Sequence, residues 1–348
     1  MKPTTRNVTR LAACLALAAA CSPDNATVGP VLPTFDRELD QSSAPLLLHV
    51  VAPQTTDPAI DKALDNHYVW LDTAARSNHT LFVFLPGTGQ NASLFQRVQQ
   101  EAARVGYHVI GLTYVSGGGF AKVCPTATDP SSCYENARLE VIDGVDRSPV
   151  ADVNPANSID NRLTKLLQYL AAQYPDEGWQ RFLLQGEPKW SRIAVAGHSQ
   201  GGGNAAMIAK IRLVARVVLF SSVTDSIHSE AASWEATHIT PAERYYGIAH
   251  DRDLFYRPIR AGWDSLGLAL FGAPATPETS SPPYGSTHTL VTDLTPQGGF
   301  AGTNAHGAPS NDLNTPLGPD GTPLLLVAWR YLLTARVGTE EIAERDEK

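Results

Sequence analysis

Residues 190–206 read WSRIAVAGHSQGGGNAA, and this stretch decides the fold that the sequence predicts. Residues 193–196 form a fully apolar run, as a buried parallel strand requires, and alanines follow Ser199 at helical spacing. The pattern predicts a strand, a tight turn and a helix, with Gly197 and Gly201 allowing the two backbones to approach closely. A serine at the apex of such a turn is a candidate nucleophile, and here it is Ser199.

The composition is that of an ordinary globular protein. The chain has 348 residues, of which 43% are hydrophobic and 18% are charged, and this length favours one large α/β domain over two. A net charge of −8 argues against a nucleic-acid partner, because proteins that bind nucleic acids usually carry a basic surface. No run of 18 apolar residues is present, so no membrane-spanning helix is predicted.

The first 21 residues have the features of a secretory signal peptide. Lys2, Arg6 and Arg10 precede a short apolar region, and the segment ends at Cys21. Residues 17–21, LAAAC, resemble a bacterial lipobox, which implies lipid attachment to Cys21, although Ala18 stands where that motif prefers leucine. An ordinary cleaved signal is the alternative. We therefore expect export, as a periplasmic or outer-membrane lipoprotein or as a secreted protein.

Three further segments follow from composition. Residues 22–43 are rich in proline, aspartate and small residues and are predicted to be a tether, and residues 337–348 a solvated charged tail. Residues 44–336 are the predicted catalytic domain. In that domain Cys124 and Cys133 are expected to form a disulfide, worth about 2.7 kcal/mol by loop entropy, with two buried thiols as the alternative.

The remaining pattern predicts a series of strands and helices. An apolar strand at 81–85, an amphipathic helix from Leu94 to Gly106 and a strand at 107–114 predict a right-handed parallel crossover. Between residues 115 and 157 the periodicity fails, which predicts a long ordered excursion beside the active site. That excursion and residues 224–241 could line a pocket, with Trp234, Trp263 and Tyr284 as apolar walls or as core. Further strands are expected at 46–51, 67–71, 215–220, 245–249 and 289–291, and further helices at 158–174 and 322–335.

The strand order, the Gly197-His198-Ser199-Gln200-Gly201 elbow and the turn at residues 85–89, LPGTG, resemble the serine esterases and lipases of the α/β-hydrolase superfamily. The resemblance covers residues 44–336. It implies an α/β-hydrolase fold with a mostly parallel central sheet of about eight strands, flanked by helices, with insertions near the active site. It also implies a catalytic triad in the chain order serine, acid, histidine.

Two residues are candidates for the catalytic base. His306 lies in a glycine-rich turn after the last predicted strand and before the final helix, where the base is expected. His288, at the start of that strand, is the alternative. His198 adjoins Ser199, but neighbouring residues of an elbow point apart, so we expect His198 to pack or bond elsewhere.

The same resemblance implies candidates for the acid and for the oxyanion donors. Asp253 precedes the apolar pair Leu254-Phe255 and is the preferred acid, with Asp251 as the alternative and the other aspartate pairing with Arg252. Backbone N–H groups must stabilise the tetrahedral oxyanion, and we expect these from Gln200 and Thr88, with Gly87 as the alternative to Thr88.

The sequence thus predicts a secreted or lipid-anchored serine hydrolase that cleaves carboxylic esters through an acyl-enzyme on Ser199. No cofactor and no metal are expected, since His250 and Asp251 lack further ligands at metal-site spacing. The substrate would be a small-molecule, lipid or polymeric ester. An amidase or peptidase with the same triad, and a non-catalytic binding protein of the same fold, are the alternatives.

Overall fold

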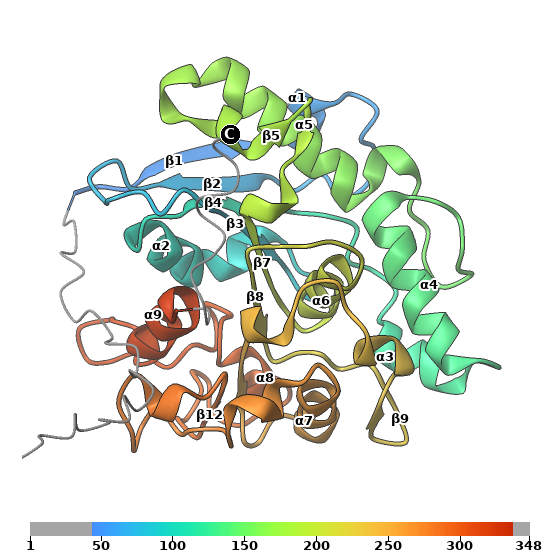
Figure 1. Cartoon of the computed structure of the whole chain (residues 1–348), viewed down its shortest axis with the longest axis vertical. Coiled ribbons are helices and arrows are strands. Elements are labelled where there is room, and N and C mark those ends of the chain that lie inside the picture. Colours follow the sequence, from blue (N-terminus) through green and yellow to red (C-terminus); the bar gives the residue numbers. More distant parts are fainter. Residues whose placement is uncertain (1–43, 337–348) are drawn as a thin grey trace, which may run out of the picture. The chain divides into compact units, whose positions relative to one another are not determined.

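The computed structural model describes residues 44–336 (Figure 1). The predicted signal peptide with Cys21, the tether at 22–43 and the tail at 337–348 lie outside the described residues. Within the described residues no helix is long and apolar enough to cross a membrane.

The centre of the described chain is an eight-stranded sheet in the order β1-β2-β4-β3-β7-β8-β11-β12. β1 and β2, and β2 and β4, pair antiparallel, whereas the other neighbours pair parallel. The predicted α/β architecture with a mostly parallel sheet of about eight strands is therefore confirmed. The strands are β1 (Leu47–Val51), β2 (His67–Leu71), β3 (Leu81–Leu85), β4 (His108–Gly111), β7 (Ile193–His198), β8 (Arg216–Phe220), β11 (Tyr245–His250) and β12 (Thr289–Thr292).

Helices cover both faces of this sheet. The strand β3 illustrates why the parallel strands of the sheet consist almost entirely of apolar residues. Phe82 and Phe84 point into a core shared with α2 (Gln96–Arg104) and α9 (Leu326–Thr334). Leu81, Val83 and Leu85 point into a second core shared with α4 (Pro130–Asp143), α5 (Ile159–Gln173), α6 (Gln200–Ile211) and α7 (Tyr256–Ser265). Figure 1 shows α2 and α9 on one side and α4 and α6 on the other. Because both faces of such a strand are buried, its sequence does not alternate between polar and apolar residues.

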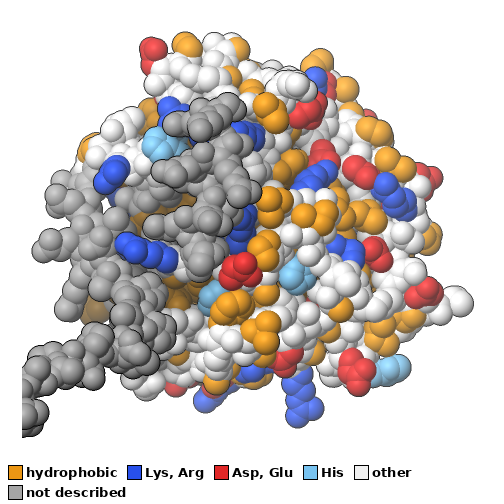
Figure 2. All heavy atoms as spheres, in the orientation of Figure 1, with side chains coloured by type: hydrophobic (Ala, Val, Ile, Leu, Met, Phe, Trp, Pro, Cys, Tyr) orange, Lys and Arg blue, Asp and Glu red, His pale blue; other side chains and the backbone are white. Residues whose placement is uncertain are grey.

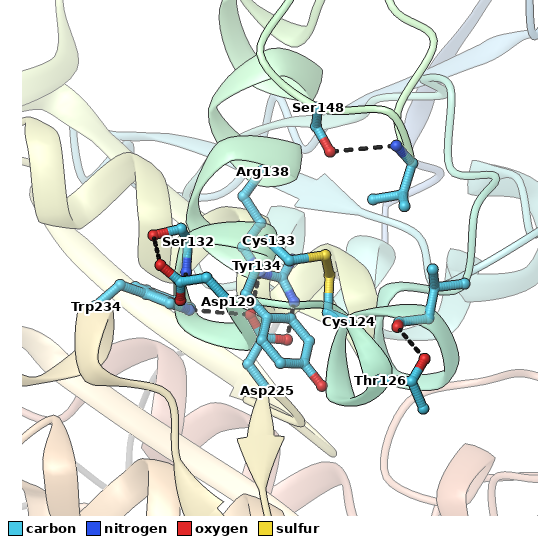
Figure 3. Close-up of a disulfide and its surroundings, with 12 residues drawn as sticks. Cys124, Thr126, Asp129, Ser132, Cys133, Tyr134, Arg138, Ser148, Asp225 and Trp234 are labelled. Atoms are coloured by element: carbon cyan, nitrogen blue, oxygen red, sulfur yellow. Dashed lines mark hydrogen bonds and ion pairs between the residues drawn. A yellow bond between two sulfur atoms is a disulfide. The ribbon is translucent and has the colours of Figure 1, made fainter.

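The excursion between β4 and α5 contains a helix that hydrophobic periodicity did not predict. α4 spans 14 residues, and its buried face carries Arg138 and Glu140 among the apolar residues, which obscures the helical pattern. The end signals were present: Asp129 caps the first turn by accepting from the Ser132 N–H, and Gly144 ends the helix with φ 77°. The predicted disulfide between Cys124 and Cys133 is confirmed and ties the start of this helix to the preceding turn (Figure 3).

Several expected boundaries shift and shorter elements fill the connections. α9 begins at Leu326 rather than at 322, and β4 ends at Gly111 rather than at 114. Trp234 and Trp263 are buried in one core and Tyr284 in the other, in line with the core alternative for these three aromatic residues. The shorter elements are α1 (Pro53–Thr56), α3 (Phe120–Val123), α8 (Asn304–Gly307), β5 (Leu183–Leu184), β6 (Glu187–Pro188), β9 (Ser226–Ile227), β10 (Glu230–Ala231) and the 3-10 turns η1 (Ala92–Phe95), η2 (Cys124–Thr126), η3 (Pro155–Asn157), η4 (Pro175–Glu177), η5 (Trp179–Phe182), η6 (Trp190–Arg192), η7 (Ser233–Ala236), η8 (Ala242–Arg244), η9 (Leu268–Phe271) and η10 (Tyr284–Ser286).

Candidate active site

Ser199 lies between the end of β7 and the start of α6, in a backbone conformation that side chains other than glycine rarely adopt. Its φ is 54° and its ψ is −121°. The Ser199 N–H donates to Phe220 O at 3.0 Å, and the Gly203 N–H donates to Ser199 O at 3.1 Å, so neighbouring structure holds the strained residue in place. The turn leaves Ser199 half-buried at the carboxyl edge of the sheet.

The elbow requires glycine because backbones on either side of it touch. A Cβ at Gly201 would lie 2.1 Å from Leu85 O at the end of β3, and a Cβ at Gly197 would lie 2.3 Å from the carbonyl carbon of Gly201. Both contacts are far below van der Waals separation and involve backbone atoms. The two glycines flanking Ser199 therefore have the steric role that the sequence pattern predicts.

Asp253 and His306 meet at the same edge of the sheet. Asp253 follows β11, and His306 lies in α8, a one-turn helix between β12 and α9. His306 Nδ1 donates to Asp253 Oδ2 at 2.7 Å, while Asp253 Oδ1 accepts from the Phe255 N–H at 2.8 Å. Both side chains are buried, with exposures of 7% and 6% for His306 and Asp253. A hydrogen on Nδ1 leaves Nε2 with a free lone pair.

His306 Nε2 is buried and has no hydrogen-bond partner within residues 44–336, so Ser199 Oγ does not donate to it in this structure. Hydrogen bonds of this kind are often long or misaligned before a substrate binds. Two consecutive residues after β8 connect the two groups: Ser221 Oγ donates to His306 O and Ser222 Oγ donates to Ser199 O, each at 2.8 Å. Ser199 and the His306 segment are thus anchored side by side.

The alternative acid lies apart from this pair. Asp251 is on the surface, and its Oδ1 lies 2.9 Å from His250 Nδ1 rather than near His306. Within residues 44–336 the expected pairing of Arg252 with an aspartate is not seen: Asp251 pairs with His250, Asp253 pairs with His306, and the Arg252 guanidinium lies 4.4 Å from the ring centroid of Phe300. Of the two aspartates, only Asp253 contacts His306.

The alternative base lies at the opposite edge of the sheet. His288 precedes β12, its Nδ1 donates to Tyr245 O at 2.9 Å, and its ring stacks between Phe271 and Tyr246. Burial lowers the pKa of His288 to about 4. It lines a cavity of about 560 Å³ between the amino ends of the strands and the end of α9. This cavity is away from Ser199, and the structure does not bring His288 to the elbow.

The turn after β3 lies against the elbow. Thr88 Oγ1 donates to Gln200 Oε1 at 2.9 Å, and Gln200 Nε2 reaches Ser116 O and Gly117 O at 3.2 Å. Among the hydrogen bonds of residues 44–336, the backbone N–H groups of Thr88 and Gln200 have no acceptor. Backbone N–H groups without an acceptor are the kind of donor that stabilises an oxyanion.

A buried ion pair next to the elbow is a feature that the sequence did not indicate. Arg138 of α4 makes two hydrogen bonds to Asp225, and its Nη1 donates to Gln200 O at 2.9 Å and to Asn204 Oδ1 at 2.8 Å. Trp234 Nε1 also donates to Asp225, at 3.1 Å (Figure 3). Arg138 therefore fastens the excursion to the first turn of α6, directly behind Ser199.

The described surface has a mixed character on the face that Figure 2 draws. On the face drawn in Figure 2, basic, acidic and hydrophobic side chains are interspersed. No group of three or more histidine, cysteine, aspartate or glutamate side chains in residues 44–336 is arranged to hold a metal ion.

Sequence comparison identifies no family for this chain. No protein-family model matches it, and no curated protein is significantly similar to it.

Proposed function

We propose that this protein is a serine hydrolase of the α/β-hydrolase fold that cleaves carboxylic esters through an acyl-enzyme on Ser199. One observation carries the proposal. A serine with φ 54° at a strand-to-helix turn shares a sheet edge with a buried histidine that is hydrogen-bonded to an aspartate. Strained non-glycine residues persist where the surrounding structure holds them, and they cluster at active sites.

The proposed reaction assigns one role to each group. Ser199 Oγ attacks the ester carbonyl carbon while His306 Nε2 accepts the hydroxyl proton, and Asp253 stabilises the resulting imidazolium. The N–H groups of Thr88 and Gln200 donate to the oxyanion of the tetrahedral intermediate. His306 then returns the proton to the leaving alcohol. Water, deprotonated by His306, attacks the acyl-enzyme and releases the carboxylic acid and free Ser199.

Export from the cytoplasm belongs to the same proposal. The disulfide between Cys124 and Cys133 supports it, because such bonds persist in oxidising compartments. Lipid attachment at Cys21 would be tested by treating cells with an inhibitor of lipoprotein signal processing and comparing the mass of the mature chain.

The function is tested by ester turnover of matched variants. Ser199→Ala should lose about 10⁶-fold in kcat and Asp253→Asn about 10⁴-fold. Asp251→Asn is the control, because Asp251 lies two residues away and contacts His250 instead, and it should stay within about twofold of wild type. Ser199→Ala retaining more than a few per cent of the activity would refute the assignment. Comparison of an ester with the matching anilide separates esterase from amidase activity.

A further inference from the structure

His198 has a side chain that the proposed reaction does not use, although it directly precedes Ser199. Its ring lies inside the protein, where only 3% of the residue is exposed. There it packs between the rings of Phe95 and His306, with centroid separations of 5.3 and 4.8 Å. His198 therefore contacts the residue assigned as the base without facing the substrate.

The contact between the two histidines is a directed hydrogen bond. His198 Nε2 lies 3.0 Å from the backbone oxygen of His306, and a carbonyl can only accept, so Nε2 carries the hydrogen. Burial, assisted by the nearby His306, lowers the pKa of His198 to about 3, so the ring is neutral. Ser221 Oγ donates to the same carbonyl at 2.8 Å. The backbone of His306 is thus held by one donor from β7 and one from the residue after β8.

The other edge of the His198 ring lies against the turn that carries Thr88. Its Nδ1 is buried with no partner in the described residues, and a Cβ at Gly87 would lie only 2.8 Å from it. The ring therefore fills the space between residues 86–88 and the His306 segment.

The His306 segment needs such an anchor. It belongs to the long connection between β12 and α9, in which Gly298, Gly299 and Gly302 all have positive φ. The hydrogen bond to Asp253 holds the tip of the His306 side chain, while the backbone bonds of α8, such as Gly307 N–H to Thr303 O and Ala308 N–H to Asn304 O, lie within the His306 segment itself. A bond to the backbone carbonyl of the same residue fixes the second point, and two fixed points define where Nε2 lies.

We propose that His198 is a positioning residue, which sets the place of the His306 imidazole relative to Ser199 through its Nε2–H···O=C hydrogen bond and keeps the Gly87-Thr88 turn at its distance. This inference rests on the proposed function. It predicts that a donor at the Nε2 position of residue 198 controls kcat.

Two amides of different length test the inference. The side-chain amide nitrogen of glutamine reaches the place of histidine Nε2, whereas that of asparagine reaches only the place of Nδ1. His198→Gln should therefore stay within about threefold of wild type, and His198→Asn should lose about 10- to 100-fold in kcat with little change in KM. Ser221→Ala removes the other donor to the same carbonyl, and on its own it should lower kcat less than His198→Asn does. Combined with His198→Asn it should lose more than the product of the two single effects.

A spectroscopic measurement reports the positioning itself. The proton shared by His306 Nδ1 and Asp253 should give a strongly deshielded resonance, assigned by its loss in Asp253→Asn. We expect this resonance in His198→Gln and its broadening or loss in His198→Asn. If His198→Asn does not fold, the positioning role is still tested by the other two variants. His198→Gln must retain the kcat of wild type, and Ser221→Ala must lower kcat.

The outcomes separate this inference from the proposed function. Wild type that fails to react with an organophosphonate would overturn the proposed function. Wild type that reacts, together with a His198→Asn variant of equal kcat and unchanged resonance, would overturn the positioning role. Equal losses in the glutamine and asparagine variants would also overturn it, because they would show that the ring volume matters and the donor does not.

Discussion

The ion pair between Arg138 and Asp225 should be the most costly electrostatic contact to break among those behind the elbow. Arg138→Met keeps most of the side-chain volume but removes the guanidinium. Arg138 and Asp225 have side chains that are 1% and 0% exposed, so water cannot replace the lost partner. Within residues 44–336 the Asp225 carboxylate would keep only the hydrogen bond from Trp234, and the backbone oxygen of Gln200 and the side-chain Oδ1 of Asn204 would each lose a donor.

The expected loss in the free energy of unfolding follows from these broken contacts. Leaving one charge of a buried pair without its partner costs about 3–5 kcal/mol. Adding Asp225→Asn removes the stranded charge, so the double variant should be less destabilised than the single one, by about 2 kcal/mol or more. For a chain of this size, with an unfolding entropy of about 0.6–0.7 kcal/mol/K, the single variant should lower Tm by roughly 4–8 °C.

The same helix supplies a control. Arg147 and Asp143 form a similar pair, with Nη1 to Oδ1 at 2.6 Å, but their side chains are 29% and 31% exposed. Arg147→Met should therefore cost less than about 1 kcal/mol. Free energies of unfolding from urea titration would measure all three variants. The reasoning fails if Arg138→Met costs no more than Arg147→Met, or if the double variant is as unstable as the single one.

Two further predictions concern a buried acid and the elbow glycine. Glu235 is fully buried, neither carboxylate oxygen has a partner in the described chain, and burial together with Asp225 raises its pKa well above the ordinary value. A raised folded-state pKa gives stability that is present below the unfolded pKa and is lost as pH rises. The Tm of Glu235→Gln should therefore gain on that of wild type as the pH rises above about 4, the pKa of an unfolded glutamate, and a difference that stays constant with pH would contradict this. Gly201→Ala should lose about 1–3 kcal/mol or more and most of the activity, because its Cβ would lie 2.1 Å from Leu85 O. Gly117→Ala, where a Cβ meets nothing within 4 Å, is the control, and equal stability of the two alanine variants in urea titration would show that the close approach is not needed.

The parts of the fold that could be predicted are those in which local pattern and burial agree. The run at Leu81–Leu85 is buried on both faces, so its apolar residues alone indicate a strand. The helix α4 could not be found in this way, because Arg138 on its buried face pairs with Asp225, which lies 87 residues away. No local pattern contains a partner at that distance in the chain.

The candidate site shows the same division. Parallel strands bring their carboxyl ends to one edge, so residues that follow β7, β11 and β12 were expected at the same edge of the sheet, and Asp253 and His306 are in contact there. The same rule would have excluded His288, since the residue before a parallel strand lies at the opposite edge. The choice between Asp253 and Asp251 depends on the direction of two side chains in one turn, which the tertiary contacts decide.

Covalent labelling tests the central claim most directly. Folded protein is treated with an organophosphonate, which reacts with activated serines, and the modified peptide is located by mass spectrometry. We predict one adduct, on Ser199, that is absent in Ser199→Ala and greatly slowed in Asp253→Asn. A folded wild-type protein without an adduct, or an adduct that persists in Ser199→Ala, would contradict the assignment of Ser199 as the nucleophile.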